Sequence, residues 1–316
     1  NLVDATPKQK LIVICGPTGI GKTAAAIAVA ETFAGEIINA DSMQVYRSMT
    51  IGTAKPTAEE RARIPHYMVD IVRPEENFDA VRFSIEARKI ARELDRRGVL
   101  AIVSGGTGLY IKAMLYGLFR SEPPDPSIRQ QLRAEAAAVG SEVMHRRLSV
   151  VDAEAAARIH VNDTFRIIRA LETVVATGQP ISEYHRRHGF RDSPFLTLKI
   201  GLDMERQRLY ERINRRVETM IAAGLVLEVR TLLGEGVGEG TKAMRSLGYR
   251  HMAAFLQGRL TWDEAVRTMK RDTRRFAKRQ LSWFRTDREI VWCSPDDIEA
   301  SYPMIEKFLG RDSSYP

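Results

Sequence analysis

The chain has 316 residues, of which 44% are hydrophobic and 28% charged, so it can bury the core of one large domain or two modest ones. No apolar run reaches the length of a membrane span, and the N-terminal residues do not resemble a signal peptide. Two cysteines indicate neither a disulfide framework nor a metal site, and we expect a cytoplasmic protein. The net charge of +8, from 48 Lys and Arg against 40 Asp and Glu, favours an anionic partner larger than a nucleotide.

The first hundred residues alternate between strand and helix patterns. The predicted strands are 10–15, 36–40, 67–72 and 99–103, and the predicted helices are 24–33, a short helix from 59, and 80–97. Strands that alternate with helices form a mostly parallel sheet covered on both faces. The chain is therefore predicted to have an α/β core that binds its ligands at the carboxyl ends of the strands.

The pattern changes after residue 121, where Pro123-Pro124-Asp125-Pro126 interrupts regular structure. Residues 128–189 show only helical patterns, 195–204 is again strand-like, and helices then continue to a late strand at 289–293. We therefore predict an α/β core with basic C-terminal helices, made of residues 1–123 and 195–316. An all-helical insertion of residues 124–194 interrupts this core.

A glycine-rich loop follows the first predicted strand. The sequence GPTGIGKT matches the phosphate-binding loop G-x-x-x-x-G-K-[ST], with a strand before it and a helical pattern after it. Backbone N–H groups and the helix N-terminus surround a polyphosphate in such loops, while the lysine neutralises charge and the threonine can ligate Mg²⁺. The sequence thus predicts a P-loop NTPase-like core that binds a di- or triphosphate. The residues of this loop are Gly16, Pro17, Thr18, Gly19, Ile20, Gly21, Lys22 and Thr23.

Two further loops leave predicted strand ends. Asp41 could cap a turn, help to hold Mg²⁺, or act as a general base, and the polar neighbours Ser42 and Gln44 favour a functional role. The amide of Gln44 offers a donor and an acceptor together, which suits the edge of an adenine base. In the loop 104–108, the glycines permit a close backbone approach to a ligand, and Thr107 offers a hydroxyl at the start of a helix.

The predicted helix 262–285 carries Arg and Lys at helical spacing on one broad face. A solvated face is one interpretation of such a pattern. Because Asp272 is the main acid along this face, we favour binding of a phosphate backbone, with Arg274, Lys278 and Arg279 among the contacting residues.

Read together, these and later segments resemble the tRNA dimethylallyltransferase family, also called tRNA isopentenyltransferases. The matching segments run through nearly the whole chain in the family's order. They are GPTGIGKT (16–23), INADSMQVYR (38–47), IGTAKP (51–56), GGTGLYIKA (105–113), RIHVNDTFRIIRALE (158–172), LGYR (247–250) and AKRQLSWFR (277–285). The family's phosphate loop often reads Ala-Ser-Gly-Lys where this chain reads Gly-Ile-Gly-Lys, which changes side chains and leaves the backbone cradle the same.

The resemblance implies transfer of a dimethylallyl group from dimethylallyl diphosphate to N6 of the adenosine just 3′ of the tRNA anticodon. The phosphate loop then holds a diphosphate leaving group instead of ATP, with Mg²⁺ on Thr23. Asp41 matches the family's general base, which takes the N6 proton. An exocyclic adenine amine is a weak nucleophile, so the reaction needs both a positioned base and a tightly held electrophile.

Further site residues follow from the resemblance by position. Thr107 matches the threonine at the mouth of the reaction channel, and with Asp41 and Lys22 it completes the predicted catalytic set. Arg212 and Arg216 match arginines near the active site, and we infer that they reach the diphosphate. The residues predicted to contact the tRNA anticodon arm are Asp41, Ser42, Met43, Gln44, Thr107, Arg129, Phe165, Arg166, Arg169, Arg245, Arg274, Lys278 and Arg279.

Three alternatives share parts of this pattern. A prenyltransferase acting on free adenine nucleotides has the same loop and base, but it has little need for a basic helical insertion. A phosphate-loop kinase of small molecules could use Asp41 as its base, yet it leaves residues 158–172 and 277–285 without a purpose. A non-enzymatic RNA-binding protein switched by nucleotide would not need an aspartate beside an open phosphate site. The family usually acts as a monomer, which we expect here.

Overall fold

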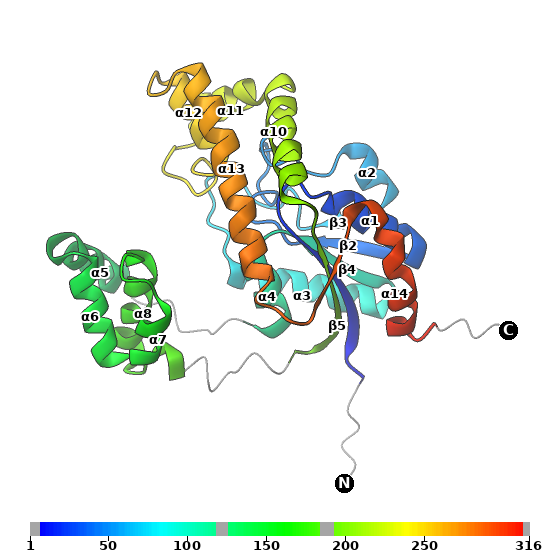
Figure 1. Ribbon diagram of the computed structural model, residues 1–316, viewed down its shortest axis with the longest axis horizontal. Helices are drawn as coiled ribbons and strands as arrows, with labels where there is room; N and C mark the ends of the chain where they lie inside the picture. The colour runs from blue at the N-terminus through cyan, green and yellow to red at the C-terminus, as the bar shows by residue number, and fades with distance from the viewer. Residues whose placement is uncertain (1–6, 118–125, 184–192, 312–316) are drawn as a thin grey trace, which may run out of the picture. The chain divides into compact units, whose positions relative to one another are not determined.

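Figure 1 shows a computed structural model of the chain, which describes residues 7–117, 126–183 and 193–311. The chain divides into two compact units. The larger unit consists of Asn1–Leu115 with Pro194–Pro316, and the smaller consists of Tyr116–Ser193. Residues 123–125, on which the predicted boundary rests, lie outside the described residues.

The larger unit is built on one six-stranded sheet, in the order β3-β2-β4-β1-β5-β6. Every strand pair in it is parallel, which confirms the predicted α/β class. The strands are β1 (Gln9–Cys15), β2 (Gly35–Asn39), β3 (His66–Tyr67), β4 (Leu100–Gly105), β5 (Phe195–Leu202) and β6 (Ile290–Cys293).

The predicted strand 67–72 is wrong in its length. Regular pairing ends at Tyr67, and Val72 forms only an isolated bridge to Tyr46. Met68 and Asp70 adopt positive φ angles of 66° and 56°, which turn the chain out of the extended conformation between these two points.

Helices cover both faces of the sheet (Figure 1). The connections β1–α1–β2 and β3–α3–β4 run in opposite directions along the sheet, so right-handed crossovers place α1 and α3 on opposite faces. On the α1 face, Ile12 and Ile14 of β1 share an apolar core with Phe33 of α1 and Ile305 of α14. The helices of this part are α1 (Lys22–Phe33), α2 (Ala58–Arg63), α3 (Ala80–Arg96), α4 (Gly108–Tyr116) and α14 (Tyr302–Leu309).

Four α-helices lie between β5 and β6, namely α10 (Arg206–Ala222), α11 (Leu225–Gly234), α12 (Tyr249–Leu256) and α13 (Trp262–Phe284). The long helix α13 packs against both α10 and α12, as Figure 1 also shows. It begins at a capping box, in which the Thr261 side chain accepts from the Glu264 N–H and the Glu264 carboxylate accepts from the Thr261 N–H. Its buried face includes Met269, Ala277 and Gln280.

The smaller unit contains α5 (Pro126–Val139), α6 (Ser141–Val151), α7 (Ala153–Arg158) and α8 (Thr164–Thr177). Leu132, Met144, Leu148 and Ile167 meet in a separate apolar core. The regular structure of its described residues is helical, since their apolar side chains recur at helical spacing and pack on one another. Among all residues that the structure describes, no helix combines the length and apolar character needed to cross a membrane.

One side chain of α11 holds the loop that follows Asp41. The Glu228 carboxylate accepts hydrogen bonds from the backbone N–H groups of Thr50, Ile51 and Gly52 at 2.9–3.2 Å, and from the Tyr249 hydroxyl. Burial, together with this carboxylate, raises the pKa of Tyr249, so the phenol stays a donor. Glu228 therefore connects three successive backbone donors to the C-terminal helices.

We expect Glu228→Ala to lower the free energy of unfolding by about 2–4 kcal/mol, because it removes several charge-assisted hydrogen bonds at once. Denaturant unfolding of the variant and the wild type measures the change. Glu235→Ala, an exposed carboxylate near the end of the same helix, should change stability by less than about 0.5 kcal/mol. Equal stabilities for the two variants would contradict the anchoring role.

Candidate active site

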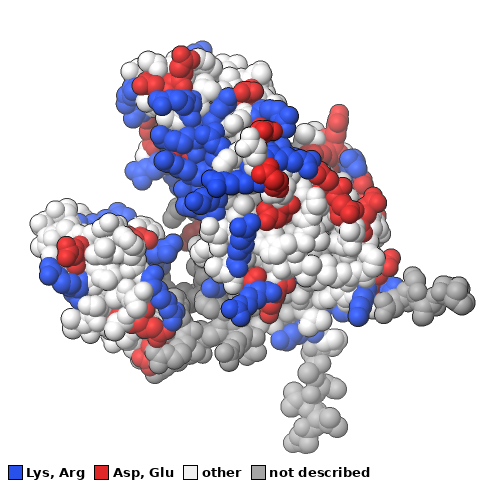
Figure 2. All heavy atoms as spheres, viewed as in Figure 1, with Lys and Arg blue, Asp and Glu red and all other residues white. Residues whose placement is uncertain are grey.

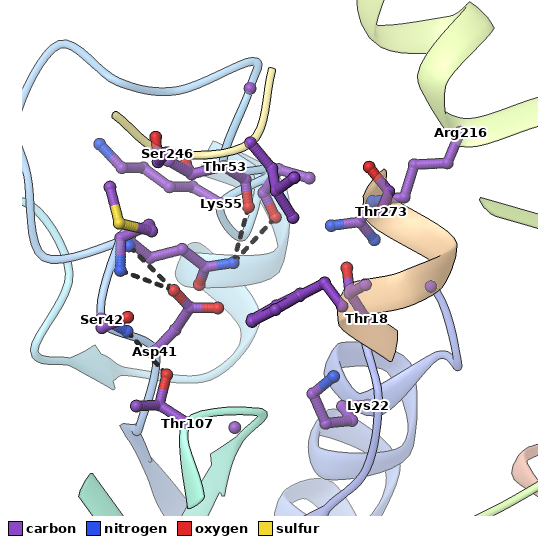
Figure 3. Close-up of a pocket in the computed structure, with 18 of the residues that line it drawn as sticks. Thr18, Lys22, Asp41, Ser42, Thr53, Lys55, Thr107, Arg216, Ser246 and Thr273 are labelled. Carbon is purple, nitrogen blue, oxygen red and sulfur yellow. Dashed lines mark hydrogen bonds between the residues drawn. The ribbon is translucent and has the colours of Figure 1, made fainter. Parts of the chain in front are cut away.

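The carboxyl ends of the central strands open onto one cavity of about 630 Å³. Cys15 of β1 pairs with Gly105 of β4, and Asn39 of β2 pairs with Ser104, so three loops leave the sheet at one edge. Figure 3 shows side chains from these loops and from α10 and α13 around the cavity. The predicted site residues in its lining are Thr18, Gly19, Gly21, Lys22, Thr23, Asp41, Ser42, Met43, Gln44, Thr107, Arg216, Arg245 and Arg279.

The phosphate-binding loop runs from the end of β1 into α1. Gly21 at the N-cap of α1 has a φ angle of 104°, a conformation that favours glycine, and it offers no side chain to cap the first N–H groups. Lys22 folds back over the loop, where its Nζ donates to the Pro17 carbonyl at 2.7 Å. The start of α1 therefore presents N–H groups and an ammonium group to the cavity, as an anion site requires.

Not every residue of this loop faces the cavity. The Ile20 side chain is fully buried in the core between the sheet and α1, and Pro17 has no N–H group but supplies the carbonyl that holds Lys22. Gly16 does not line the cavity. The Thr18 N–H, which we expected to bind phosphate, donates instead to Oε1 of Gln280 at 2.9 Å, so this donor is already satisfied within the protein.

Positive charges crowd the phosphate loop. Burial, and secondarily the positive charge of Arg216, lowers the pKa of Lys22 to about 8. Burial also lowers the pKa of Arg216, while Asp41 opposes this shift and Arg212 adds to it. The Arg212 guanidinium lies beside Gly21, and Figure 3 shows Arg216 pointing into the cavity from α10. The protein thus holds several cations together at a point where a diphosphate could neutralise them.

Asp41 lies across the cavity from Lys22. Its Oδ1 accepts the backbone N–H groups of Met43 at 2.8 Å and Gln44 at 3.2 Å, which fixes the carboxylate and the turn after it. Its second oxygen faces the cavity (Figure 3). One oxygen therefore holds the loop while the other is free to accept a proton from a bound molecule.

Thr107 holds the same loop from a neighbouring strand end. Its Oγ1 accepts the Ser42 N–H at 3.0 Å, and its own N–H donates to the Ala40 carbonyl at 3.2 Å. Asp41 thus lies between two residues whose backbones are both bonded to Thr107. The structure places Thr107 where it positions the predicted base, at the cavity surface.

The interpretation of Gln44 as a reader of an adenine edge needs correction. Its side-chain amide donates to the Thr53 and Ala54 carbonyls, and its Oε1 accepts from Nδ2 of Asn39 at 2.7 Å. Gln44 is only 8% exposed. Because these partners use both amide hydrogens, the side chain serves to hold the loop 41–54 together.

Gln280 of α13 contacts two of the three loops at the strand ends, and the sequence assigned it no role. Its Oε1 accepts from the Thr18 N–H, and its Nε2 donates to the Gly106 carbonyl at 2.8 Å. These partners lie 262 and 174 residues away along the chain, so no local pattern could have indicated them.

A basic surface extends from the cavity over α10 and α13 (Figure 2). Within the described residues, Arg275, Lys278 and Arg279 are exposed and have no carboxylate partner, whereas Lys270 pairs with Glu218. Arg274 is more constrained than the sequence indicated, because its guanidinium donates to the Asn214 side chain and lies over the Tyr210 ring. The exposed Arg and Lys side chains on α13 are Arg267, Arg271, Arg275, Lys278 and Arg279, and the loop before α12 adds Lys242 and Arg245.

In the smaller unit, the predicted tRNA contacts differ in exposure. Phe165 is 72% exposed near the start of α8, and the neighbouring Arg166 pairs with Asp163. Arg129 and Arg169 both donate hydrogen bonds to the carboxylate of Glu172, which is buried. Burial alone would raise the pKa of Glu172, and the two guanidinium groups hold it below its ordinary value.

The cavity can be tested against the donor set that Mg²⁺ prefers. Thr23, Lys22 and Asp41 all line the cavity. The described residues contain no group of three or more His, Cys, Asp or Glu able to hold a metal ion. Mg²⁺ commonly keeps several waters and binds one or two protein oxygens with substrate phosphates. The residues present therefore fit an Mg²⁺ ion that arrives with a diphosphate, and they do not form a self-sufficient metal site.

The sequence model of the IPP transferase family matches residues 44–287. The chain belongs to this family. The tRNA dimethylallyltransferase of Desulfosudis oleivorans is 51% identical over 303 residues, covering 96% of both chains. The tRNA dimethylallyltransferase 2 of Geotalea uraniireducens is 53% identical over 291 residues, which cover 92% of this chain and 94% of the relative.

Solved structures of the family have the same fold. The tRNA isopentenylpyrophosphate transferase of Bacillus halodurans has a TM-score of 0.73 at 39% identity, over 97% of this chain and 98% of that one. A eukaryotic dimethylallyltransferase acting on tRNA has a TM-score of 0.82 at 26% identity, over 97% and 81% of the two chains. These findings confirm the predicted family, the predicted P-loop NTPase-like fold and the classification of the chain as a transferase.

The pKa of Lys22 yields a pH prediction for binding of dimethylallyl diphosphate, the donor that the resemblance implies. Lys22 loses its proton at about pH 8 in the free protein, and a bound anion favours the charged ammonium. Binding above this pH therefore takes up a proton, and affinity should fall by up to about tenfold per pH unit. Calorimetric titrations from about pH 7 to about pH 9.5 measure this slope.

Lys22→Arg is the matched control, because a guanidinium keeps its charge throughout this range. Its affinity should stay nearly constant where that of the wild type falls. Equal slopes for the two proteins would assign the titration to another group.

Proposed function

We propose that this protein transfers a dimethylallyl group from dimethylallyl diphosphate to N6 of the adenosine 3′ of a tRNA anticodon. The observation that carries the proposal is the pairing, in one cavity, of a fixed carboxylate with a cationic phosphate loop on the opposite wall. Membership of the IPP transferase family and relatives named tRNA dimethylallyltransferase support this assignment over a kinase.

The phosphate loop would bind the electrophile. The first N–H groups of α1, the Lys22 ammonium and the Arg216 guanidinium face the space where a diphosphate fits. As the allylic C–O bond breaks, its electron pair passes to the diphosphate oxygen, and these donors stabilise the added negative charge. Thr23 would hold Mg²⁺ on the same diphosphate, and the ion when bound neutralises part of that charge.

The loop 41–44 would serve the acceptor. The N6 lone pair forms the new bond to the allylic carbon, and the free oxygen of Asp41 accepts the N6 proton. Because Oδ1 of Asp41 is already held by two backbone donors, the carboxylate cannot rotate freely away from its acceptor. The Thr107 hydroxyl accepts the Ser42 N–H and so holds the turn after Asp41 in place.

The basic surface would bind the tRNA. The target base is stacked within the anticodon loop, so it must leave the stack to reach the cavity, at a cost of a few kcal/mol. Phosphate contacts to Arg245, Lys278 and Arg279 can offset that cost. In the smaller unit, the exposed Phe165 is available to the same partner, and Arg129 is part-exposed beside its ion pair with Glu172.

The deciding experiment incubates the full chain with Mg²⁺ and radiolabelled dimethylallyl diphosphate and offers unmodified tRNA or adenosine monophosphate. We expect label on tRNA at the adenosine beside the anticodon and none on the mononucleotide. Label on the mononucleotide alone would indicate the free-nucleotide enzyme. Absence of transfer together with ATP turnover on a small acceptor would overturn the proposal.

Asp41→Asn tests the general base within the same assay. Asparagine keeps Oδ1 as an acceptor for Met43 and Gln44 but cannot take up a proton. We expect transfer to fall by about 10²–10⁴-fold while tRNA affinity changes by only a few-fold, as judged by filter binding. Near wild-type turnover in this variant would exclude Asp41 as the base.

The basic surface yields a salt prediction. The double substitution Lys278→Glu and Arg279→Glu should weaken tRNA binding and reduce the slope of log affinity against log salt by about 1–2. Arg92→Glu on α3 is the control, an exposed arginine outside the cavity lining. A double variant with the wild-type slope would show that these two side chains do not contact phosphate.

A further inference from the structure

The phosphate-binding loop 16–23 and the loop 104–108 follow two strands of the same sheet. One side chain also links these two loops directly. Gln280 lies on the buried face of α13 and is 8% exposed. It accepts from the Thr18 N–H at 2.9 Å and donates to the Gly106 carbonyl at 2.8 Å. A single carboxamide thus joins the phosphate-binding loop to the loop that carries Thr107.

The surroundings of Gln280 are closely packed. A Cβ atom added to Gly106 would lie 2.4 Å from Nε2 of Gln280 and 3.2 Å from the Gly16 carbonyl oxygen. Only a glycine lets the two loops approach this closely with the carboxamide between them. The link therefore depends on both residues, and Gln280 fits the space as well as the hydrogen bonds.

The link continues on both sides to the groups that would act on substrate. On one side, Thr18 belongs to the loop that ends at Lys22. On the other side, Gly106 precedes Thr107, whose hydroxyl bonds Ser42 beside Asp41. Gln280 therefore belongs to a series of bonded residues that runs from the cationic loop to the loop that carries Asp41.

The same helix carries part of the basic surface. Lys278 and Arg279 immediately precede Gln280 and are exposed, while Gln280 points inward. Phosphate contacts on the outer face of α13 and loop contacts on its inner face therefore belong to one rigid segment. A nucleic acid held by the outer face would be aligned with both loops through the inner one.

Resting on the proposed function, we infer that Gln280 is a positioning residue for the transfer. It fixes the phosphate-binding loop against the Thr107 loop, so that the bound diphosphate ester and the acceptor nitrogen meet in line. It does not touch the reacting atoms. Its loss should therefore lower the rate of transfer at saturation more than the affinity for either substrate.

Gln280→Met tests this inference, because methionine has a similar length and volume but forms neither hydrogen bond. With wild-type enzyme as reference, single-turnover transfer at saturating tRNA and dimethylallyl diphosphate should slow by about 10- to 100-fold. The dissociation constants for the two substrates should change by less than about threefold. Amide hydrogen exchange at Thr18 should become faster, since its N–H loses its acceptor.

Gln257→Met controls for the substitution itself, since Gln257 bonds Glu239 and lies outside the cavity lining. It should transfer at the wild-type rate. If Gln280→Met does not fold, Gln280→Asn decides, because its amide is one methylene shorter and cannot reach both partners; the same loss of rate is expected.

Two results would overturn the inference. An unchanged saturating rate in a folded variant would show that the link does not position the substrates. A raised KM for tRNA with an unchanged kcat would make Gln280 a tRNA contact instead. Failure of the wild type to modify tRNA would overturn the proposed function, and that result is separate from either of these.

Discussion

The parallel pairing of β2, β4, β1 and β5 is the constraint on which the rest of the cavity depends. In this register Cys15 lies opposite both Gly105 and Gly201, so the strands end at nearly the same level. Each loop that follows must then leave at one edge of the sheet. The loop 16–23 and the Asp41 carboxylate meet at this edge although they belong to separate segments of the sequence.

Side chains from the C-terminal helices complete what the sheet begins. Glu228 holds the backbone of residues 50–52, Gln280 joins two loops, and Arg216 brings a cation to the phosphate loop. Glu228 and Gln280 satisfy backbone groups from a distant part of the chain, whereas Arg216 adds positive charge beside Lys22. The hydrogen bonds of Glu228 and Gln280 hold these loops in place, and fixed groups of this kind are what effective electrostatic stabilisation of a transition state requires.

The charge distribution of the cavity follows from the same arrangement. Burial lowers the pKa of Lys22 and of Arg216, so the protein bears an electrostatic cost in the absence of an anion. The helix N-terminus adds further positive potential. An anion such as a diphosphate would relieve this cost on binding.

Local patterns were sufficient for much of the architecture. The phosphate loop was predictable because its motif has fixed residues at fixed spacing. β1 was predictable as a short continuous apolar run, and α3 was predictable from the helical period of its apolar residues. The segment 67–72 was predicted wrongly, since left-handed residues such as Met68 interrupt a pattern that reads as a strand. Local propensity carries no sign of such a turn at a methionine.

The sequence by itself determined the fold class and, through the order of its motifs, the family, and it predicted the phosphate site. Only the tertiary structure decided how individual groups are used: the Gln44 amide and the Thr18 N–H, both expected to face a ligand, have partners inside the protein. The same holds for Gln280, whose role depends on partners far away in the chain. The physical reason is that the partner of a hydrogen-bonding group depends on which groups lie next to it. Those neighbours are brought together only when distant segments of the chain pack against one another.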